Sequence, residues 1–203
     1  MSFADYTSLK SAVASDWMHR ADLTTAIGDY IALFESDFNS QMRVRQMETE
    51  TSQVSTAGYL THPTSWLEWK NIRGTQGGVQ YSLEPVTDEV GVAITGGDST
   101  PARYYKTTGS RTYLYPSASG VTYPCIYFAG VALTSGTNWL LTAYPGAYLY
   151  GTLLQAVAAG MDDARVGLWA TAYEAILERI RKDSRRGSFG GQALRMQLDS
   201  RVV

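Results

Sequence analysis

The residues that could bind a metal are few and stand far apart. His19 falls at the end of an expected helix and His62 precedes a proline, and neither has a second ligand at metal-binding spacing. A cation near a helix C-terminus explains His19 better than a ligand does, and a solvated loop explains His62. Adjacent Asp162 and Asp163 precede another expected helix, where they would cap it. We therefore expect no metal site.

Nucleophilic and phosphate-binding motifs have no better support. Cys125 lies among aromatic residues with nothing nearby to lower its thiol pKa, so we expect it to be buried and unreactive. The pairs Gly77-Gly78 and Gly96-Gly97 are not followed by Gly-Lys-Ser/Thr, which favours turns over a phosphate loop. There is no Gly-x-Ser-x-Gly elbow. We expect no catalytic residue and no cofactor, and an enzyme is the weakest of the hypotheses considered below.

The composition narrows the class of protein further. The 203 residues include 17 basic and 19 acidic side chains, and this balance gives none of the broad positive field on which nucleic-acid affinity relies. With a single cysteine, no internal disulfide can form, and the sequence predicts no signal peptide or membrane span. Fourteen tyrosines and five tryptophans suit half-buried strands and protein interfaces alike.

The apolar residues of the first 42 positions repeat at helical spacing. Tyr6, Leu9, Val13 and Trp17 define one helical face, for which Thr7 is the expected cap. A longer stripe follows over residues 27–42. We expect a helical hairpin over about residues 7–42.

The central residues, about 43–133, carry β signals. We expect a strand over residues 43–51, a short helical turn leading into a strand over 59–72, and a glycine-rich loop over 71–78. The clearest signal is a hairpin formed by residues 103–106 and 112–115. A third strand follows over 122–133, and Pro124 argues that it begins at a sheet edge.

Helical spacing returns over about residues 138–183. Asn138 is a good cap for a short turn, and the helix after Asp162 has the most regular apolar stripe of the chain. We expect this C-terminal helical pair to pack on the N-terminal hairpin in a single α+β domain, residues 1–186. The expected core residues are the aromatic and branched side chains Trp17, Phe34, Phe38, Trp139, Trp169, Tyr173 and Ile176.

The last residues, 187–203, lose the helical period and gain glycines, so we expect a tail. A basic cluster closes the preceding helix, where it complements the helix dipole. Apolar side chains in a segment without a core are typical of chains that become ordered on a partner. The candidate docking residues are Arg185, Arg186, Phe189, Leu194, Arg195, Met196 and Leu198.

Several stretches together resemble the head-to-tail adaptor (connector) family of tailed bacteriophages and gene transfer agents, related to tail tubular protein A. The most specific is Asn138-Trp139-Leu140-Leu141, followed by Leu149-Tyr150-Gly151. Residues 9–23, the segment 38–47 with Arg43-Val44-Arg45, and the glycine-rich tail up to Met196 are similar as well.

This resemblance implies a structural protein of the virion neck, made in the host bacterial cytoplasm. Members form a ring, usually of twelve copies, under the portal protein and pass DNA through the lumen to a tail or stopper protein. The resemblance also implies that the helices build the ring wall, that the β segment extends toward the tail and that the C-terminal tail engages the portal. The alternatives are another neck ring, namely a stopper or tail-completion protein, or a carbohydrate- or ligand-binding β module.

Overall fold

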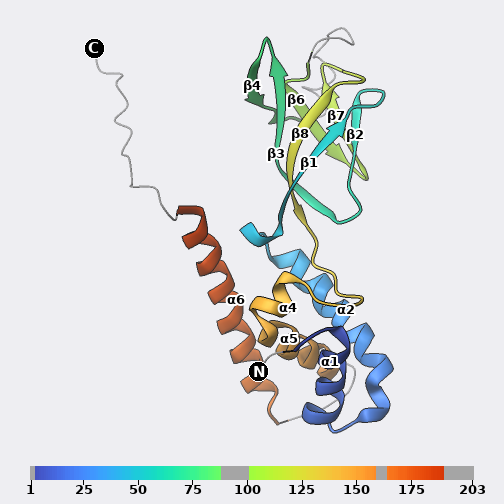
Figure 1. Ribbon diagram of the computed structural model, residues 1–203, viewed down its shortest axis with the longest axis vertical. Coiled ribbons are helices and arrows are strands. Elements are labelled where there is room, and N and C mark those ends of the chain that lie inside the picture. The colour runs from blue at the N-terminus through green and yellow to red at the C-terminus, as the bar shows by residue number, and fades with distance from the viewer. Residues whose placement is uncertain (1–2, 88–100, 159–163, 190–203) are drawn as a thin grey trace, which may run out of the picture. The chain divides into compact units, whose positions relative to one another are not determined.

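The computed structural model describes residues 3–87, 101–158 and 164–189 (Figure 1). It confirms a mixed helix and strand fold, with mostly antiparallel sheets. The chain forms two compact units: a helical unit of Met1–Ser36, Val44–Gln46 and Leu133–Val203, and a β unit of Asp37–Arg43 and Met47–Ala132. The single domain expected over residues 1–186 stays a prediction. Gly96-Gly97 and Asp162-Asp163 lie outside the described residues.

The cap of the first helical segment lies two residues earlier than expected. Helix α1 (Tyr6–Ser11) is capped by Asp5, whose carboxylate accepts the Ser8 backbone N–H at 2.8 Å, while the Ser8 hydroxyl accepts the Asp5 N–H at 2.9 Å. This reciprocal pair satisfies two backbone donors, which explains why Thr7 is not the cap. A π-helix (Ala12–Trp17) and a 3₁₀ turn (Ala21–Leu23) lead into α2 (Thr24–Gln41).

After the β unit, the described residues form the helices α4 (Trp139–Ala143), α5 (Pro145–Ala158) and α6 (Val166–Phe189). The Phe34 ring of α2 contacts both α5 and α6, with centroids 5.0 Å from Tyr148 and 6.1 Å from Tyr173. The Trp17 ring lies 5.9 Å from Tyr150. Of the expected core residues, Phe34, Phe38, Trp169 and Tyr173 are buried, whereas Trp17, Trp139 and Ile176 are partly buried.

Within residues 47–87 and 101–132, the β unit shows two four-stranded sheets. One has the order β1 (Glu48–Val54), β8 (Thr122–Ala129), β3 (Trp66–Gln76) and β4 (Val79–Ser82). The other has the order β2 (Tyr59–Thr61), β7 (Arg111–Tyr115), β6 (Tyr104–Thr108) and β5 (Glu84–Pro85). The hairpin expected from the tyrosine-rich strands is confirmed as β6–β7, and β5 pairs with β6 in parallel.

Three expectations for the β segment are wrong. Residues Arg45–Met47 form a 3₁₀ turn, so the first strand begins only at Glu48. Over residues 59–72 we expected a helical turn leading into a strand; the strand is present as β3, but its start is preceded by strand β2 and not by a helical turn. Strand β3 also continues through the expected loop to Gln76. The glycine signal misled because Gly74 lies within the strand: a Cβ there would come within 2.5 Å of the Tyr81 ring, so glycine lets that ring pack on the backbone.

Pro124 does not mark an edge strand, because β8 lies between β1 and β3. The last pair of the β3–β8 register is Ile72 with Cys125, so Pro124 falls just outside that ladder. On its other side it pairs with Ser52 of β1. The missing N–H therefore costs little, even in a central strand.

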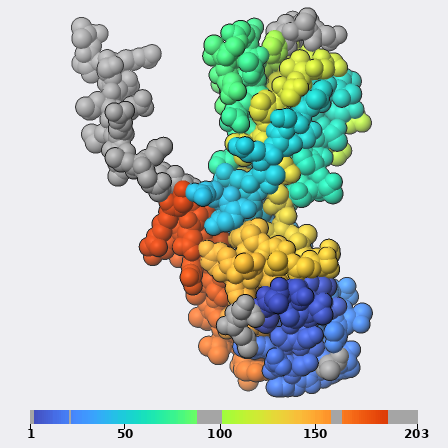
Figure 2. Space-filling view, in the orientation of Figure 1, coloured from blue at the N-terminus to red at the C-terminus, as the bar shows by residue number. Residues whose placement is uncertain are grey.

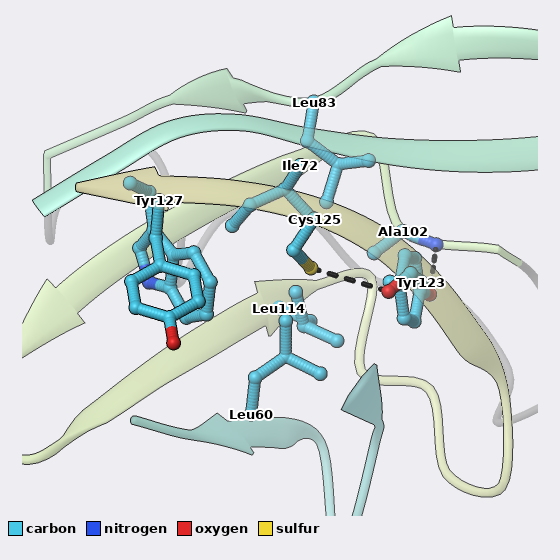
Figure 3. Packing of buried hydrophobic residues seen from close by; sticks show 9 residues of the cluster. Leu60, Ile72, Leu83, Ala102, Leu114, Tyr123, Cys125 and Tyr127 are labelled. Carbon is cyan, nitrogen blue, oxygen red and sulfur yellow. Dashed lines mark hydrogen bonds between the residues drawn. The ribbon is translucent and has the colours of Figure 1, made fainter. Parts of the chain in front are cut away.

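Side chains from both sheets form the core of the β unit (Figure 3). Leu60 and Leu114 come from one sheet, and Ile72 and Cys125 from the other. Cys125 is 1% exposed, its thiol donates to the Tyr123 carbonyl, and burial raises its pKa to about 12. Its expected burial is confirmed, and a thiol with so high a pKa carries almost no thiolate at neutral pH.

Glycine at position 151 allows α5 to approach α2. A Cβ at Gly151 would lie 2.2 Å from the Phe34 ring, whereas a Cβ at Gly167, in the first turn of α6, meets nothing within 4 Å. The two glycines thus occupy opposite environments in the same helical unit.

We expect Gly151→Ala to destabilise the helical unit by about 1–3 kcal/mol, because Phe34 must move to admit the methyl group. Gly167→Ala is the matched control and should stabilise by up to about 1 kcal/mol through reduced chain entropy. Urea unfolding followed by helical circular dichroism measures both. Equal midpoints for the two variants would contradict the close approach of α5 to Phe34.

Candidate functional site

The residues that could bind a metal or a phosphate have structural roles in the fold. His19 ends the π-helix region at a positive φ of 52°, and its Nδ1 lies 3.0 Å from the Ser15 carbonyl oxygen, at a helix C-terminal end as expected. Gly77 and Gly78 have positive φ values of 57° and 81° between β3 and β4, as turn glycines do. Within the described ranges, no group of three potential metal ligands occurs and no helix is long and apolar enough to cross a bilayer.

His62 is packed more tightly than the solvated loop residue we expected. Its ring stacks on Trp66 at 3.7 Å between centroids, and its Nε2 lies 2.9 Å from the Thr112 hydroxyl, which also accepts the Trp69 indole N–H at 2.7 Å. Burial lowers the pKa of His62. The His62 ring therefore belongs to an aromatic cluster over β3. It is not solvated as we expected from its position before a proline.

A buried chain of hydrogen bonds joins α2 to α5. The Tyr148 hydroxyl donates to the Glu35 carboxylate at 2.7 Å and accepts from the Asn138 side-chain amide at 2.6 Å. The Asn138 oxygen accepts the Leu141 N–H at 2.9 Å and so caps α4, as expected. Glu35 is only 9% exposed and Tyr148 fully buried.

The electrostatics of this chain follow from its burial. Desolvation raises the pKa of Glu35, although the Tyr148 hydrogen bond opposes the change. Desolvation and the neighbouring carboxylate likewise raise the pKa of Tyr148. Polar groups buried in this way are stable only while all of them are paired. The Asn138-Trp139-Leu140-Leu141 motif thus supplies both a helix cap and a partner for Tyr148.

The two arginines of Arg43-Val44-Arg45 hold the C-terminal ends of two helices. The Arg43 guanidinium donates to the carbonyls of Asn39 and Met42 at the end of α2 and lies 3.1 Å from the Glu68 carboxylate. The Arg45 guanidinium donates to the Gly187 carbonyl, and its backbone N–H donates to the Ser184 hydroxyl at 2.9 Å. Cations at helix C-termini satisfy free carbonyls and complement the dipole.

The Arg45 guanidinium lies close to the backbone at Gly187, where a Cβ would come within 2.8 Å of it. We call the contact of Arg45 with Ser184 and Gly187 the Arg45 clamp. Val44, between the two arginines, is 3% exposed. The three-residue motif therefore anchors α6 close to the point where the described chain ends.

A family model for the SU10 adaptor protein matches residues 4–196 of the sequence. The chain belongs to the SU10 adaptor protein family. This confirms the resemblance to a phage head-to-tail adaptor family, because the match covers nearly the whole chain. A search of curated proteins found no match.

The candidate docking residues of this adaptor fall in two groups. Arg185 and Arg186 are exposed on the last turns of α6, which lies on the surface in red in Figure 2. Helix α6 ends at Phe189, so the first three residues of the expected tail are helical. Leu194, Arg195, Met196 and Leu198 lie outside the described residues, and their docking role stays a prediction.

Sequence analysis missed Glu35 and the roles of Arg43 and Arg45. A signal for Glu35 was present, because it lies four residues after Ile31 and three before Phe38, inside the apolar stripe of α2. An acidic residue at such a position requires a buried partner. The contacts of Arg45 join residues at least 139 positions apart in the sequence, so local spacing gives no indication of them.

We expect Arg45→Ala to loosen the last turn of α6. Losing a charge-assisted hydrogen bond should speed amide exchange of residues 184–189 about tenfold. Hydrogen–deuterium exchange measures this, and Arg43→Ala is the matched control, because its contacts lie at the end of α2. If exchange at 184–189 is the same in Arg45→Ala and the unaltered protein, the Arg45 clamp does not hold α6.

We expect Glu35→Gln to change how stability depends on pH. Because the pKa of Glu35 is raised above its ordinary value of 4.5, this carboxyl stabilises the fold below that value, and the contribution is lost as pH rises through the folded pKa. Glutamine keeps an acceptor for Tyr148 without the buried charge. The stability of Glu35→Gln relative to the unaltered protein should therefore increase with pH above about 4.5.

Urea titrations at several pH values measure the difference, with exposed Asp29→Asn on the same helix as the control. A stability difference for Glu35→Gln that is constant with pH would show that Glu35 does not carry a raised pKa.

Proposed function

We propose that this adaptor forms a ring under the portal protein, joins the capsid to the tail and conducts DNA through its lumen. The observation that supports this most strongly is the match of the SU10 adaptor protein family to residues 4–196. The ring would have about twelve copies, as the resemblance implies, and would contact a tail or stopper protein on its other side. It would assemble in the host bacterial cytoplasm and remain in the virion neck.

The contacts within the helical unit support a structural role. The most specific family-like stretch runs from Asn138 to Gly151. Within it Asn138 caps α4, Tyr148 bonds to Glu35, and Gly151 leaves room for the Phe34 ring. These side chains keep helices in contact. The described residues of the stretch thus serve the rigidity that a ring subunit needs.

The charge balance supports a conduit for DNA. A net charge of −2 provides little attraction for phosphates over the molecule as a whole. DNA that must pass through a ring is better served by a surface that does not hold it. The exposed cations near the end of α6, Arg185 and Arg186, are then available for the portal.

We propose that residues 190–203, together with Arg185 and Arg186, dock on the portal. Each tail would tether a subunit that its neighbours already hold, so weak individual contacts would add up around the ring. The Arg45 clamp would fix the position from which each tail starts.

Deletion of residues 190–203 tests the docking role and leaves the Arg45 clamp in place. We expect the truncated protein to keep its helix content but to lose attachment to portal-bearing heads, because the apolar tail residues are gone. Sedimentation of heads with bound adaptor measures attachment. A variant in which a Gly-Ser segment of equal length replaces residues 190–203 is the control for chain length and should also fail. Normal attachment of the truncated protein would contradict the docking role.

The order of addition separates an adaptor from a stopper or tail-completion protein. Heads that carry the portal and no other neck protein should bind this chain directly. If binding requires another neck protein to be present first, the chain lies farther from the portal than we propose.

A further inference from the structure

The outward side of the second β sheet carries tyrosines and cations. Along β7, Thr112 and Leu114 are buried, whereas Arg111 and Tyr113 are exposed, so the odd-numbered side chains point outward. The register places neighbours from β2 and β6 in the same rows. We call this set the tyrosine–arginine face: Tyr59, Thr61, Tyr104, Lys106, Thr108, Arg111, Tyr113 and Tyr115.

The central contacts of this face are between rings and a guanidinium. The Arg111 guanidinium lies over the Tyr59 ring, 4.3 Å from its centroid, and Tyr59 lies 6.2 Å from Tyr113. Stacking holds the guanidinium flat without using its N–H donors, which can still bind a carboxylate in bidentate fashion. Tyr113 is 37% exposed, one of the few large apolar side chains exposed among the described residues.

The face carries two cations, Arg111 and Lys106, and one carboxylate. Strands β2, β6 and β7 contain no aspartate or glutamate. The carboxylate is that of exposed Glu84 on the edge strand β5, which is registered with Tyr104. Tyrosine and arginine are enriched in protein interfaces, from which acidic side chains are depleted. The face therefore complements a protein surface that presents carboxylates.

A nucleic acid fits this face less well. Two cations would neutralise about two phosphates, and non-specific affinity depends on many such contacts. A carboxylate needs only one well-placed guanidinium for a bidentate, charge-assisted pair. The observations favour an acidic protein segment over a polyphosphate chain.

We propose that the tyrosine–arginine face docks a carboxylate-bearing segment of a partner protein, with Arg111 as its anchor and Tyr59 and Tyr113 as its apolar floor. The proposal rests on the proposed function, in which this adaptor contacts another protein of the particle. It assigns that contact to β2, β6 and β7 and gives the partner its chemistry.

A matched pair of arginines allows a direct test. Arg103 is also exposed and also stacks on a tyrosine, 3.9 Å from the Tyr81 centroid, but it lies outside this face and bonds to Gln76. The probes are a ten-residue oligoglutamate peptide and a ten-nucleotide oligothymidylate. Both are titrated into the isotope-labelled full-length protein, and backbone amide shifts are recorded.

We expect the peptide to shift amides of β2, β6 and β7, and Arg111→Ala to weaken its binding about tenfold while Arg103→Ala does not. The unshifted remainder of each spectrum shows that both variants are folded. The proposal is overturned if the peptide shifts no amides of this face, if both variants lose binding equally, or if the oligothymidylate binds more tightly than the peptide. Self-association that Arg111→Ala abolishes would also overturn it, because a second copy would then be the occupant.

Particle assembly separates this proposal from the proposed function. If the unaltered protein joins particles, Arg111→Glu should block joining and Arg103→Glu should not. Equal joining by the unaltered protein and Arg111→Glu overturns the docking face alone. Absence of the unaltered protein from particles overturns the proposed function, whatever the peptide titration shows.

Discussion

The helical unit depends on one buried chain of polar groups, from Glu35 through Tyr148 to Asn138. Burying a carboxylate and a phenol in an apolar interior costs free energy unless each is hydrogen-bonded. These hydrogen bonds form in only one packing of α2 against α4 and α5. The same packing brings Phe34 against the glycine at position 151. Polar pairing and close approach thus fix the same arrangement, and neither tolerates a shift of the helices.

The C-terminal end of α6, to which we assign the docking role, is held in a comparable way. Arg45, in the 3₁₀ turn Arg45–Met47, bonds to the last turns of α6. These bonds fix the position of the helix end and therefore of its exposed cations. A ring subunit that binds a neighbour through a short segment gains from this, because a fixed starting point reduces the entropy lost on docking. The β unit, with its own core and its own outward tyrosine–arginine face, offers a second and chemically different surface.

Patterns carried by neighbouring residues could be predicted from the sequence. The β6–β7 hairpin, the Asn138 cap and the buried stripe of α6 all follow from spacing within about ten residues. What failed were features set by side-chain packing between elements. The Tyr81 ring packs on the backbone at Gly74, and His62 belongs to an aromatic cluster with Trp66 and bonds to Thr112, which lies 50 residues away. Local propensity cannot report such contacts, and the tertiary structure overrides it.

The central claim is that this SU10-family adaptor works as a ring between capsid and tail, and imaging of the assembled particle tests it most directly. We expect density for many symmetric copies of this chain directly under the portal, around an open channel. We also expect the C-terminal residues of each copy to contact a portal subunit. A particle neck that contains a single copy of the chain, or none, would contradict the account.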